Sequence, residues 1–247
     1  MNTFDQVKEI IKNSNNIVFF GGAGVSTASG LPDFRSATGL YNRKNNSAYS
    51  PEYMLSHEFL IKHPDEFMKY IKENLMVDGI KPNACHYALS KLEKMGKLKG
   101  IITQNIDSLH QDAGSKNVIE LHGNIKDYYC MNCGKNFDLD YIKKYEDIAT
   151  CDRCGGIIRP DVVLYGEGLN QDNISYAINL IAKAEVLIIG GTSLAVYPAA
   201  GLIDFYRGDK LILINMEATS RDNIANYILQ GDISKIMEKL VEEDDEK

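Results

Sequence analysis

The chain contains apolar runs that each end in glycine or polar residues. The clearest are NIVFF at 16–20, KGIITQNID at 99–107, AEVLIIGGTSL at 184–194 and DKLILINME at 209–217, with the shorter VIELHG at 118–123. Stretches with apolar residues at helical spacing cover 5–13, 83–95, 198–207 and 232–241. Continuous apolar strands that alternate with helices predict a Rossmann-like α/β fold, in which helices cover both faces of a mostly parallel sheet.

Two segments break this alternation. Residues 38–82 begin as a polar loop and continue as helices, with a boundary at His63-Pro64. Residues 127–156 hold four cysteines and almost no aliphatic run. We therefore predict a small domain made of a helical insertion (38–82) and a cysteine-bearing module (127–156). The Rossmann-like domain would be formed by the rest of the chain, 1–37, 83–126 and 157–247.

The composition is that of an ordinary globular protein, with 44% hydrophobic and 25% charged residues. The formal net charge is −7, so direct nucleic-acid binding is not expected, because phosphate contacts need clustered Lys and Arg. The N-terminus lacks the basic and apolar regions of a signal peptide. No stretch approaches the roughly 18 apolar residues needed to cross a bilayer. We expect a cytoplasmic protein that does not engage a membrane.

Four of the five cysteines form two C-x-x-C pairs. Cys130 and Cys133 are followed, after a gap of 17 residues, by Cys151 and Cys154. This spacing is typical of zinc ribbons, and cytosolic chains use such pairs for metal more often than for disulfides. Four thiolates leave no open position, so the predicted Zn²⁺ ion is structural. The alternative is a set of unrelated buried or redox cysteines. Cys85 stands alone and is expected to be a small core residue.

A glycine-rich turn follows the first apolar strand. A strand, a tight turn and the start of a helix would place free backbone N–H groups at one point, which suits a pyrophosphate. Gly22, Ala23 and Gly24 open a G-x-G-x-x-G pattern in which Thr27 replaces the third glycine. The alternative is a turn whose glycines serve only a positive φ angle.

Polar residues also follow the next two strands. Gln104, Asn105 and Asp107 could orient a polar ligand such as a carboxamide. His122 lies between a strand and Gly123, which suits an exposed general base because the pKa of histidine lies near working pH. The alternative for a single histidine is a surface or core residue without a chemical role. That structural role is assigned to the other histidines, His57, His63, His86 and His110.

As a set, these segments resemble the sirtuin family. The matching stretches are GAGVSTASGLPDFRS (22–36), TQNIDSLHQDAG (103–114), LHG (121–123), the two cysteine pairs, RPDVVLYGE (159–167), GTSLAVYPAA (191–200) and INME (214–217). The resemblance implies an NAD-dependent protein-lysine deacylase. Such enzymes transfer the acyl group of an acyl-lysine to the ADP-ribose of NAD, releasing nicotinamide and forming O-acyl-ADP-ribose. The partners would be proteins or peptides that contain acyl-lysine.

The resemblance also implies roles for individual residues. His122 would be the general base, Asp107 would grip the nicotinamide carboxamide and Asn105 would help order the catalytic site. The pyrophosphate and the loop that covers nicotinamide would involve Gly22, Ala23, Gly24, Thr27, Phe34 and Arg35. The nicotinamide and ribose pocket would be lined by Gln104, Asn105, Ile106, Asp107 and His122. The adenosine half would be held by Gly191, Thr192, Ser193, Asn215, Glu217 and Asp232. Asp232 is explained equally well as the cap of the last helix.

The substrate side is also implied by the resemblance. A peptide would add a strand, through main-chain hydrogen bonds, beside Val162, Val163, Leu164 and Tyr165. The alternative is that this stretch is only a core strand. Met68 and Ile71 stand where sirtuins specialised for acidic acyl groups carry Tyr and Arg. We therefore expect apolar acyl groups such as acetyl, with longer chains allowed.

Two other functions are weighed against the deacylase. A mono-ADP-ribosyltransferase would use the same NAD site and leave ADP-ribose covalently on a protein. A nucleotide sensor or zinc-ribbon interaction module would bind without turnover. The acidic charge and the presence of both Arg35 and His122 argue against such a binding module.

Overall fold

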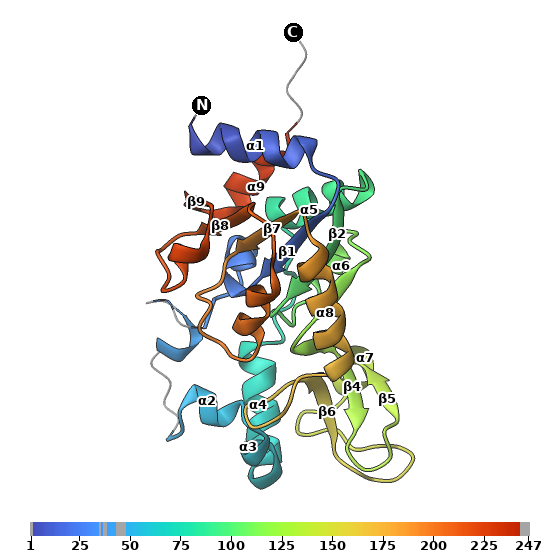
Figure 1. The fold of residues 1–247 in the computed structure, drawn as a ribbon. Helices are drawn as coiled ribbons and strands as arrows, with labels where there is room; N and C mark the ends of the chain where they lie inside the picture. Colours follow the sequence, from blue (N-terminus) through green and yellow to red (C-terminus); the bar gives the residue numbers. More distant parts are fainter. Residues whose placement is uncertain (1, 35, 37–38, 43–47, 243–247) are drawn as a thin grey trace.

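The computed structural model describes residues 2–34, 36, 39–42 and 48–242. The chain forms a larger part built on a six-stranded sheet and a smaller part that contains a three-stranded sheet. In Figure 1 the first and last helices, α1 (Thr3–Asn13) and α9 (Ile233–Val241), lie at the end of the larger part that is remote from the smaller part. Among the described residues, no helix is long and apolar enough to cross a membrane.

The six-stranded sheet is parallel throughout and has the order β3-β2-β1-β7-β8-β9. Its strands are β1 (Ile17–Gly21), β2 (Leu98–Thr103), β3 (Val118–Glu120), β7 (Val186–Gly190), β8 (Leu211–Asn215) and β9 (Tyr227–Gln230). The chain starts at the centre, builds outward through β2 and β3, and then returns to build outward through β7, β8 and β9. This is the strand order of a Rossmann-like fold, so the predicted fold class is confirmed.

Helices cover both faces of this sheet. They are α1 (Thr3–Asn13), α5 (Ala84–Lys94), α6 (Leu109–Asp112), α8 (Gln171–Lys183) and α9 (Ile233–Val241). Ile17 and Phe19 of β1 belong to the core that includes α1, α5 and α9. Val18 and Phe20 belong to a second core, which includes α8. Because side chains alternate across a strand, β1 serves both cores, and this explains its continuously apolar sequence.

The smaller part combines the helical insertion with the cysteine-bearing module. Its elements are α2 (Pro51–Met54), α3 (His57–Lys62), α4 (Pro64–Asn74), β4 (Gly123–Cys130), β5 (Asn136–Asp138), α7 (Leu139–Ile142) and β6 (Ile158–Val162). β4 pairs antiparallel with both β5 and β6. Phe59 and Phe67 of the insertion share one hydrophobic cluster with Tyr128 and Ile158 of the sheet. The two segments therefore share a core, and their sheet extends beyond both ends of 127–156.

Two segments expected to form or begin α-helices are 3₁₀ helices instead. After the glycine turn come η1 (Ala23–Val25) and η2 (Thr27–Ser29), and Gly30, with φ of +94°, ends the second. The stretch at 198–207 forms η4 (Ala199–Phe205), with Pro198 just before it. The two turns after the strand are too short for a ladder of α-helical hydrogen bonds, which favours the tighter i→i+3 pattern. Two further 3₁₀ turns are η3 (Leu40–Asn42) and η5 (Asp222–Ile224).

The other predicted helices are confirmed. The stretches at 5–13, 83–95 and 232–241 form α1, α5 and α9, whose first turns are capped by the side chains of Asn2, Asn83 and Asp232. Helices α3 and α4 meet at His63-Pro64, with Pro64 in the first turn of α4. Helix α8 and strand β9 have no counterpart among the predicted elements.

Candidate functional site

The carboxyl ends of β1, β2, β7 and β8 lie side by side, because these strands are parallel neighbours in the sheet. The strand order reverses between β1 and β7. Open α/β sheets bind ligands in the crevice at such a switch point. The loops that leave these four strands carry most of the polar residues predicted to bind NAD.

Gly22 and Gly24 are explained by the close approach of two loops. A Cβ on Gly22 would lie 2.8 Å from Thr192 Cβ, and a Cβ on Gly24 would lie 2.8 Å from Gly191 Cα. Neither residue has a positive φ angle, so the alternative that they serve only such an angle is wrong. The structure thus uses both glycines to pack the loop after β1 against the loop after β7.

Most backbone N–H groups of this turn are already bonded within the chain. Those of Gly22 and Gly24 donate to Gly190 and Gly191, and those of Val25 and Ser26 donate back into the turn. The predicted row of free donors is therefore wrong, because the turn closes into 3₁₀ helices. Ala23 has no such bond within the described part of the chain, so its N–H is one of the donors left for a ligand.

Ser26 is buried at the centre of a hydrogen-bond network. Its Oγ donates to Asp107 Oδ2 at 2.6 Å and accepts from Asn105 Nδ2 at 3.0 Å. Asp107 Oδ1 accepts the N–H of Leu109 at 2.9 Å. Because a carboxylate offers about four lone-pair sites, Asp107 keeps acceptor capacity for a ligand. Ser26 is not among the predicted site residues, although its place directly after the glycine turn is a signal for it.

A chain of hydrogen bonds joins four predicted residues that lie at or just after the carboxyl ends of four different strands. His122 Nδ1 lies 2.8 Å from the carbonyl oxygen of Gln104, whose Nε2 donates to Thr192 Oγ1 at 3.1 Å. The N–H of Thr192 donates to Asn215 Oδ1 at 3.0 Å, and Asn215 Nδ2 donates back to the Thr192 carbonyl at 3.1 Å. The loops after β3, β2, β7 and β8 are therefore held in one connected arrangement.

The bond to Gln104 fixes the tautomer of His122. A carbonyl oxygen only accepts, so Nδ1 carries the proton and Nε2 keeps its lone pair. Burial lowers the pKa of His122 below its ordinary value of 6.5, and the bond to the Gln104 carbonyl opposes this only in part. The imidazole is neutral near pH 7, as a general base must be.

Gly123, directly after His122, has a geometric reason to be glycine. Its φ angle is +75°, and a Cβ at this position would lie 1.9 Å from the carbonyl oxygen of Asp161. Only a residue without a side chain lets β4 begin here while it pairs with β6. The sequence Leu-His-Gly therefore sets the histidine at the corner between the larger and the smaller part.

Phe34 and Ile106 lie where the two parts of the molecule meet. Both pack against the core of the smaller part. The Phe34 ring contacts the Tyr41 ring edge-on, with centroids 5.4 Å apart, and the carbonyl of Ile106 accepts the N–H of Ile125 at 2.9 Å. Arg35, predicted beside Phe34, lies outside the described residues.

The remaining residues predicted on the NAD side surround this arrangement. Thr27, Ser193 and Glu217 are exposed. Asp232 accepts the N–H of Ser234 at 2.9 Å and thereby caps α9, as the structural alternative requires. The residue before it, Gly231, donates its N–H to the carbonyl of Asn215, so the cap also lies near the adenosine-side residues.

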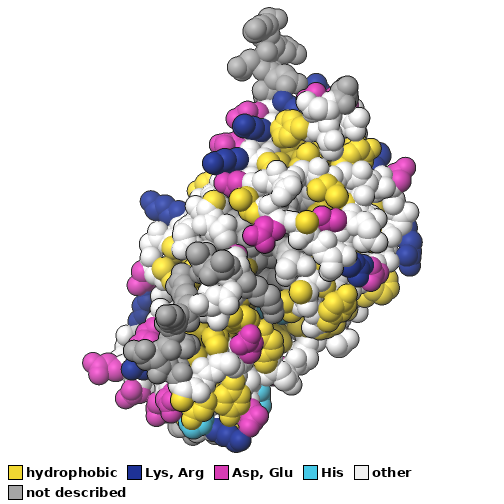
Figure 2. Space-filling model, turned by 90° about the vertical axis from the view of Figure 1, so that its left-hand side faces the viewer, with side chains coloured by type: hydrophobic (Ala, Val, Ile, Leu, Met, Phe, Trp, Pro, Cys, Tyr) yellow, Lys and Arg dark blue, Asp and Glu magenta, His cyan; other side chains and the backbone are white. Residues whose placement is uncertain are grey.

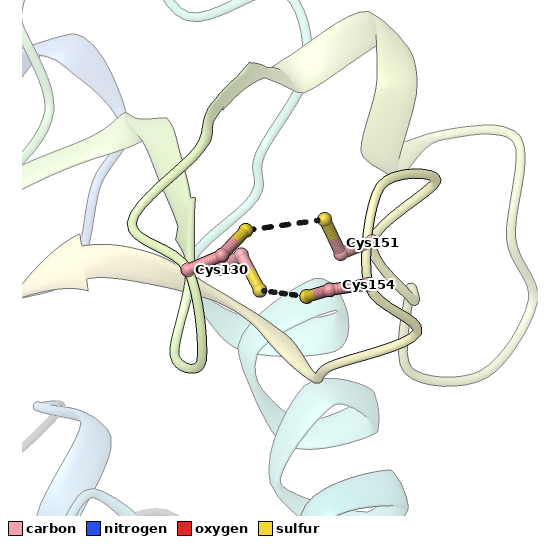
Figure 3. A group of neighbouring side chains, drawn as sticks. Cys130, Cys151 and Cys154 are labelled. Atoms are coloured by element: carbon pink, nitrogen blue, oxygen red, sulfur yellow. Dashed lines mark hydrogen bonds between the residues drawn. The ribbon is translucent and has the colours of Figure 1, made fainter.

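The four predicted zinc ligands meet at one point. Their sulfur atoms all lie within 4.8 Å of one another, with Cys130–Cys154 at 3.5 Å and Cys133–Cys151 at 3.7 Å. Thiolates around a tetrahedral zinc with bonds of about 2.3 Å are about 3.8 Å apart, whereas disulfide sulfurs are about 2.05 Å apart. Figure 3 shows sulfur atoms from two loops pointing toward one another. The cluster fits one zinc ion, and the alternative of unrelated cysteines is wrong.

The two loops that carry these cysteines have the same local structure. The N–H of Gly134 donates to the carbonyl of Cys130 at 2.9 Å, and that of Gly155 donates to Cys151 at 2.8 Å. Both glycines have positive φ angles, +66° and +70°. Cys130 ends β4, where it pairs with Ile158 at the start of β6. The other ends of these two strands lie at His122 and Val162.

The stretch predicted to pair with a peptide already uses its main chain within the protein. Val163 donates its N–H to the carbonyl of His122 at 2.9 Å. Tyr165 donates to Leu55 and accepts from His57, each at 3.0 Å. A peptide strand that pairs along 162–165 would have to replace some of these main-chain hydrogen bonds with its own. The peptide site therefore stays a prediction.

A buried ion pair also holds the stretch 162–165 in place. The guanidinium group of Arg159, which is 2% exposed, donates to both carboxylate oxygens of Glu167 and to the carbonyl of Val162. Glu167 also accepts the N–H of Leu164 at 2.9 Å. Burial alone would raise the pKa of Glu167, but the hydrogen bonds from Arg159, Leu164 and His57 outweigh it and lower the pKa. This pair is absent from the predicted site residues, and the signal for it is two charged residues that flank an apolar strand.

A groove lies beside Tyr165 on the smaller part. Its volume is about 630 Å³, and its lining includes Tyr53, His57, Ile61 and Tyr165. Figure 2 shows hydrophobic side chains gathered at the surface in the lower half of the molecule, which is the half that holds α2–α4 in Figure 1. The smaller part therefore offers apolar surface next to the predicted peptide strand.

The residues given structural roles occupy structural positions. Cys85 is fully buried in the core under α5. His86 and His110 are buried against each other, with ring centroids 4.7 Å apart. His57 begins α3 and His63 lies between α3 and α4 in the smaller part, with side chains 47% and 31% exposed.

Comparison with known proteins gives consistent results. Residues 22–198 match the Sir2 family. An NAD-dependent protein deacetylase of Clostridium acetobutylicum is 54% identical over 98% of this chain and 99% of its own length. A Sir2–p53 peptide–NAD⁺ complex is similar in structure, with a TM-score of 0.84, 39% identity and 97% of each chain covered. A Sir2 histidine-to-alanine variant with deacetylated p53 peptide and 3′-O-acetyl-ADP-ribose gives a TM-score of 0.88, with 38% identity and 96% of each chain covered.

Proposed function

The chain belongs to the Sir2 family, and we propose that its NAD-dependent protein deacetylase activity is carried out at the switch point of the larger sheet. The reaction transfers the acyl group of an acyl-lysine to the ADP-ribose of NAD, releases nicotinamide and forms O-acyl-ADP-ribose. The carrying observation is the hydrogen-bond chain from neutral His122 through Gln104 and Thr192 to Asn215. It ties a general base to the loops that would hold the cosubstrate.

NAD, when bound, supplies the ADP-ribosyl acceptor and the nicotinamide leaving group. On the phosphate side, Ala23 offers its N–H, and the absence of side chains on Gly22 and Gly24 lets the loops close beneath it. On the nicotinamide side, Ser26 and Asn105 hold Asp107 in a fixed position, so that its remaining lone pairs can accept from a carboxamide. Held in this way, these groups need little rearrangement on binding.

His122 has the proton-accepting role in this proposal. With Nδ1–H committed to the Gln104 carbonyl, Nε2 is the atom that takes a proton from a ribose hydroxyl of the cosubstrate. The same bond orients the ring, which is what a general base at this corner needs. Phe34 and Ile106, at the junction of the two parts, would help exclude water.

The acyl-lysine peptide would lie along the stretch 162–165, which Arg159 and Glu167 hold in place. The neighbouring groove would receive side chains of the peptide on either side of the acyl-lysine. Met68 and Ile71 are both fully buried in the core of the smaller part. Neither offers a partner to an anionic acyl group. The residue assignments of the peptide side belong to this proposal. So does the division into 1–37, 83–126 and 157–247 against 38–82 and 127–156, except that β4 and β6 extend the smaller part beyond both ends of 127–156.

An acyl-lysine peptide panel tests the function. With NAD, acetyl-lysine is expected to be removed at least about tenfold faster than succinyl-lysine, because an unpaired carboxylate in the acyl site costs about 1.4 kcal/mol or more, which is a factor of ten. Rates are measured by mass spectrometry of the peptide, with identical reactions lacking NAD as the control. Faster removal of succinyl-lysine would contradict the acyl-group assignment.

The pH dependence of kcat/KM tests the base. Burial lowers the pKa of His122 below 6.5, and the neutral form of the imidazole is the active one. Activity therefore rises as the pH passes through this lowered pKa. Above it, the protonation of His122 no longer limits activity. The acid limb of the profile is therefore expected below pH 6.5. An acid limb centred above 6.5 would mean that His122 is not the titrating base.

The comparisons give no support to the mono-ADP-ribosyltransferase alternative. Membership of an enzyme family, together with the position of His122 beside the predicted NAD-binding residues, excludes a protein that only binds a nucleotide or a partner without turnover. We place the protein in the cytoplasm, with one structural Zn²⁺ ion bound to the four cysteines. Its partners are proteins or peptides that contain acyl-lysine.

A further inference from the structure

Six buried side-chain atoms in the described part of the chain have no protein hydrogen-bond partner, and all lie on α5, on α6 or on a residue soon after α6. The atoms are His86 Nε2, Ser90 Oγ, both ring nitrogens of His110, Gln111 Oε1 and Ser115 Oγ. Buried polar groups in native proteins are nearly always satisfied by protein or by ordered water. Their gathering in one contact region therefore needs an explanation.

The two histidines lie at the centre of this group. His86 is fully buried and His110 is 1% exposed. His86 Nδ1 accepts the N–H of Asn83 at 3.2 Å, so Nε2 carries the proton and must find an acceptor. Burial lowers the pKa of His86 to about 4 and that of His110 to about 3, so both rings are neutral. The ring of neutral His110 has one N–H that needs a hydrogen-bond acceptor and one bare nitrogen that needs a hydrogen-bond donor.

The serines border the same contact. Ser90 lies one helical turn after His86 on α5, on the same face. A Cβ built on Gly114 would lie 3.3 Å from Ser90 Oγ, so the end of α6 passes directly over this hydroxyl. Ser115 donates its N–H to the carbonyl of His110 at 3.0 Å. The Gln111 side chain hydrogen-bonds Glu120, and its Oε1 stays available.

We infer that the α5–α6 contact is a binding site for internal water. A buried water makes about three hydrogen bonds, so six atoms call for about two molecules. The site holds both donors and acceptors, namely a proton on His86 Nε2, one on His110 and two hydroxyls, and water can meet either need. An apolar ligand could satisfy none of them.

This water has a consequence for the segment that carries Asp107. Asp107 and Ser108 lead directly into α6, and Asp107 Oδ1 accepts the N–H of Leu109, the first residue of that helix, at 2.9 Å. The hydrated contact therefore supports the helix to which the Asp107 carboxylate is bonded. Ser90 and Ser115 act as positioning residues for Asp107 through the bound water.

Magnetic relaxation dispersion of water, with a high-resolution crystal structure, tests the site in the full zinc-loaded chain. About two long-lived internal waters are expected at His86 Nε2 and His110. The double variant Ser90→Ala/Ser115→Ala is expected to lose at least one of these bound waters. The two single variants, which alter the fold less, repeat the same measurement. Ser14→Ala is the matched control, since that buried hydroxyl already donates to Glu185 at 3.2 Å. A dry contact, with the six atoms bonded directly to protein, would overturn the inference.

A kinetic readout tests the positioning role and rests on the proposed NAD site, whereas the water measurement does not. The Ser90→Ala/Ser115→Ala variant is expected to raise KM for NAD several-fold and to leave KM for the acetylated peptide unchanged. Equal changes in both constants, or no change with the water lost, would overturn the positioning role. Bound water in an enzyme without NAD-dependent activity would contradict the proposed function alone.

Discussion

Replacing His122 with alanine is expected to lower kcat for deacetylation by about 100- to 10,000-fold, the usual contribution of a general base. The variant loses Nε2, the lone pair aimed into the site, and the bond from Nδ1 to the Gln104 carbonyl. The bonds that join Gln104, Thr192 and Asn215 do not pass through the imidazole. NAD affinity is therefore expected to change much less than kcat, which calorimetry alongside steady-state rates would show.

His63→Ala is the matched control for this experiment. His63 precedes α4 on the smaller part, and its side chain is 31% exposed, so its loss should leave kcat near the wild-type value. If His122→Ala kept wild-type kcat, the proton-accepting role would have to move to another group. If it lost NAD binding in proportion to kcat, the histidine would be a binding residue.

Removing the zinc is expected to abolish activity although no cysteine touches the substrate. The metal end of β4 and β6 is Cys130 paired with Ile158, and the opposite end is Gly123 paired with Val162. Loosening the metal end frees the strands that set His122 and the predicted peptide stretch. A structural zinc contributes about 10 kcal/mol or more in small zinc-binding peptides, which is comparable to the whole stability of a domain.

Cys151→Ser provides the genetic form of this test. It is expected to reduce bound zinc below one per chain and to lower the melting temperature together with kcat. Cys85→Ala is the control, because that cysteine lies in the core under α5, outside the metal cluster, and should keep one zinc per chain. Full activity in protein shown to be free of metal would contradict the structural role.

The larger sheet could be predicted because its signals are local. The strands β1, β7 and β8 are continuous apolar runs that end in glycine or a polar residue, and β2 departs from this pattern only at Lys99. A parallel sheet places the ends of these strands together. The zinc cluster was equally predictable, since two C-x-x-C pairs at ribbon spacing have few other uses. In both cases the residues that matter are close to one another in sequence.

Most features that could not be predicted from the sequence depend on contacts between residues that are distant along the chain. Ser26 and Asp107 are 81 positions apart, and the place of Ser26 after the glycine turn does not reveal that it bonds to Asp107. The 3₁₀ form of the glycine turn follows from its packing against Gly191, which also consumes the N–H groups predicted to be free. The α5–α6 contact likewise arises only when separate elements pack together. The Arg159–Glu167 pair spans only eight positions, but two charged residues that flank an apolar strand do not show that the chain brings them together.

The most direct test of the central claim is a product balance with acetyl-lysine peptide and NAD. Mass spectrometry of the complete reaction should find one nicotinamide and one O-acetyl-ADP-ribose for each lysine deacetylated, with no reaction when NAD is withheld. Acetyl removal without NAD, or ADP-ribose left covalently on protein in place of free O-acetyl-ADP-ribose, would contradict the account.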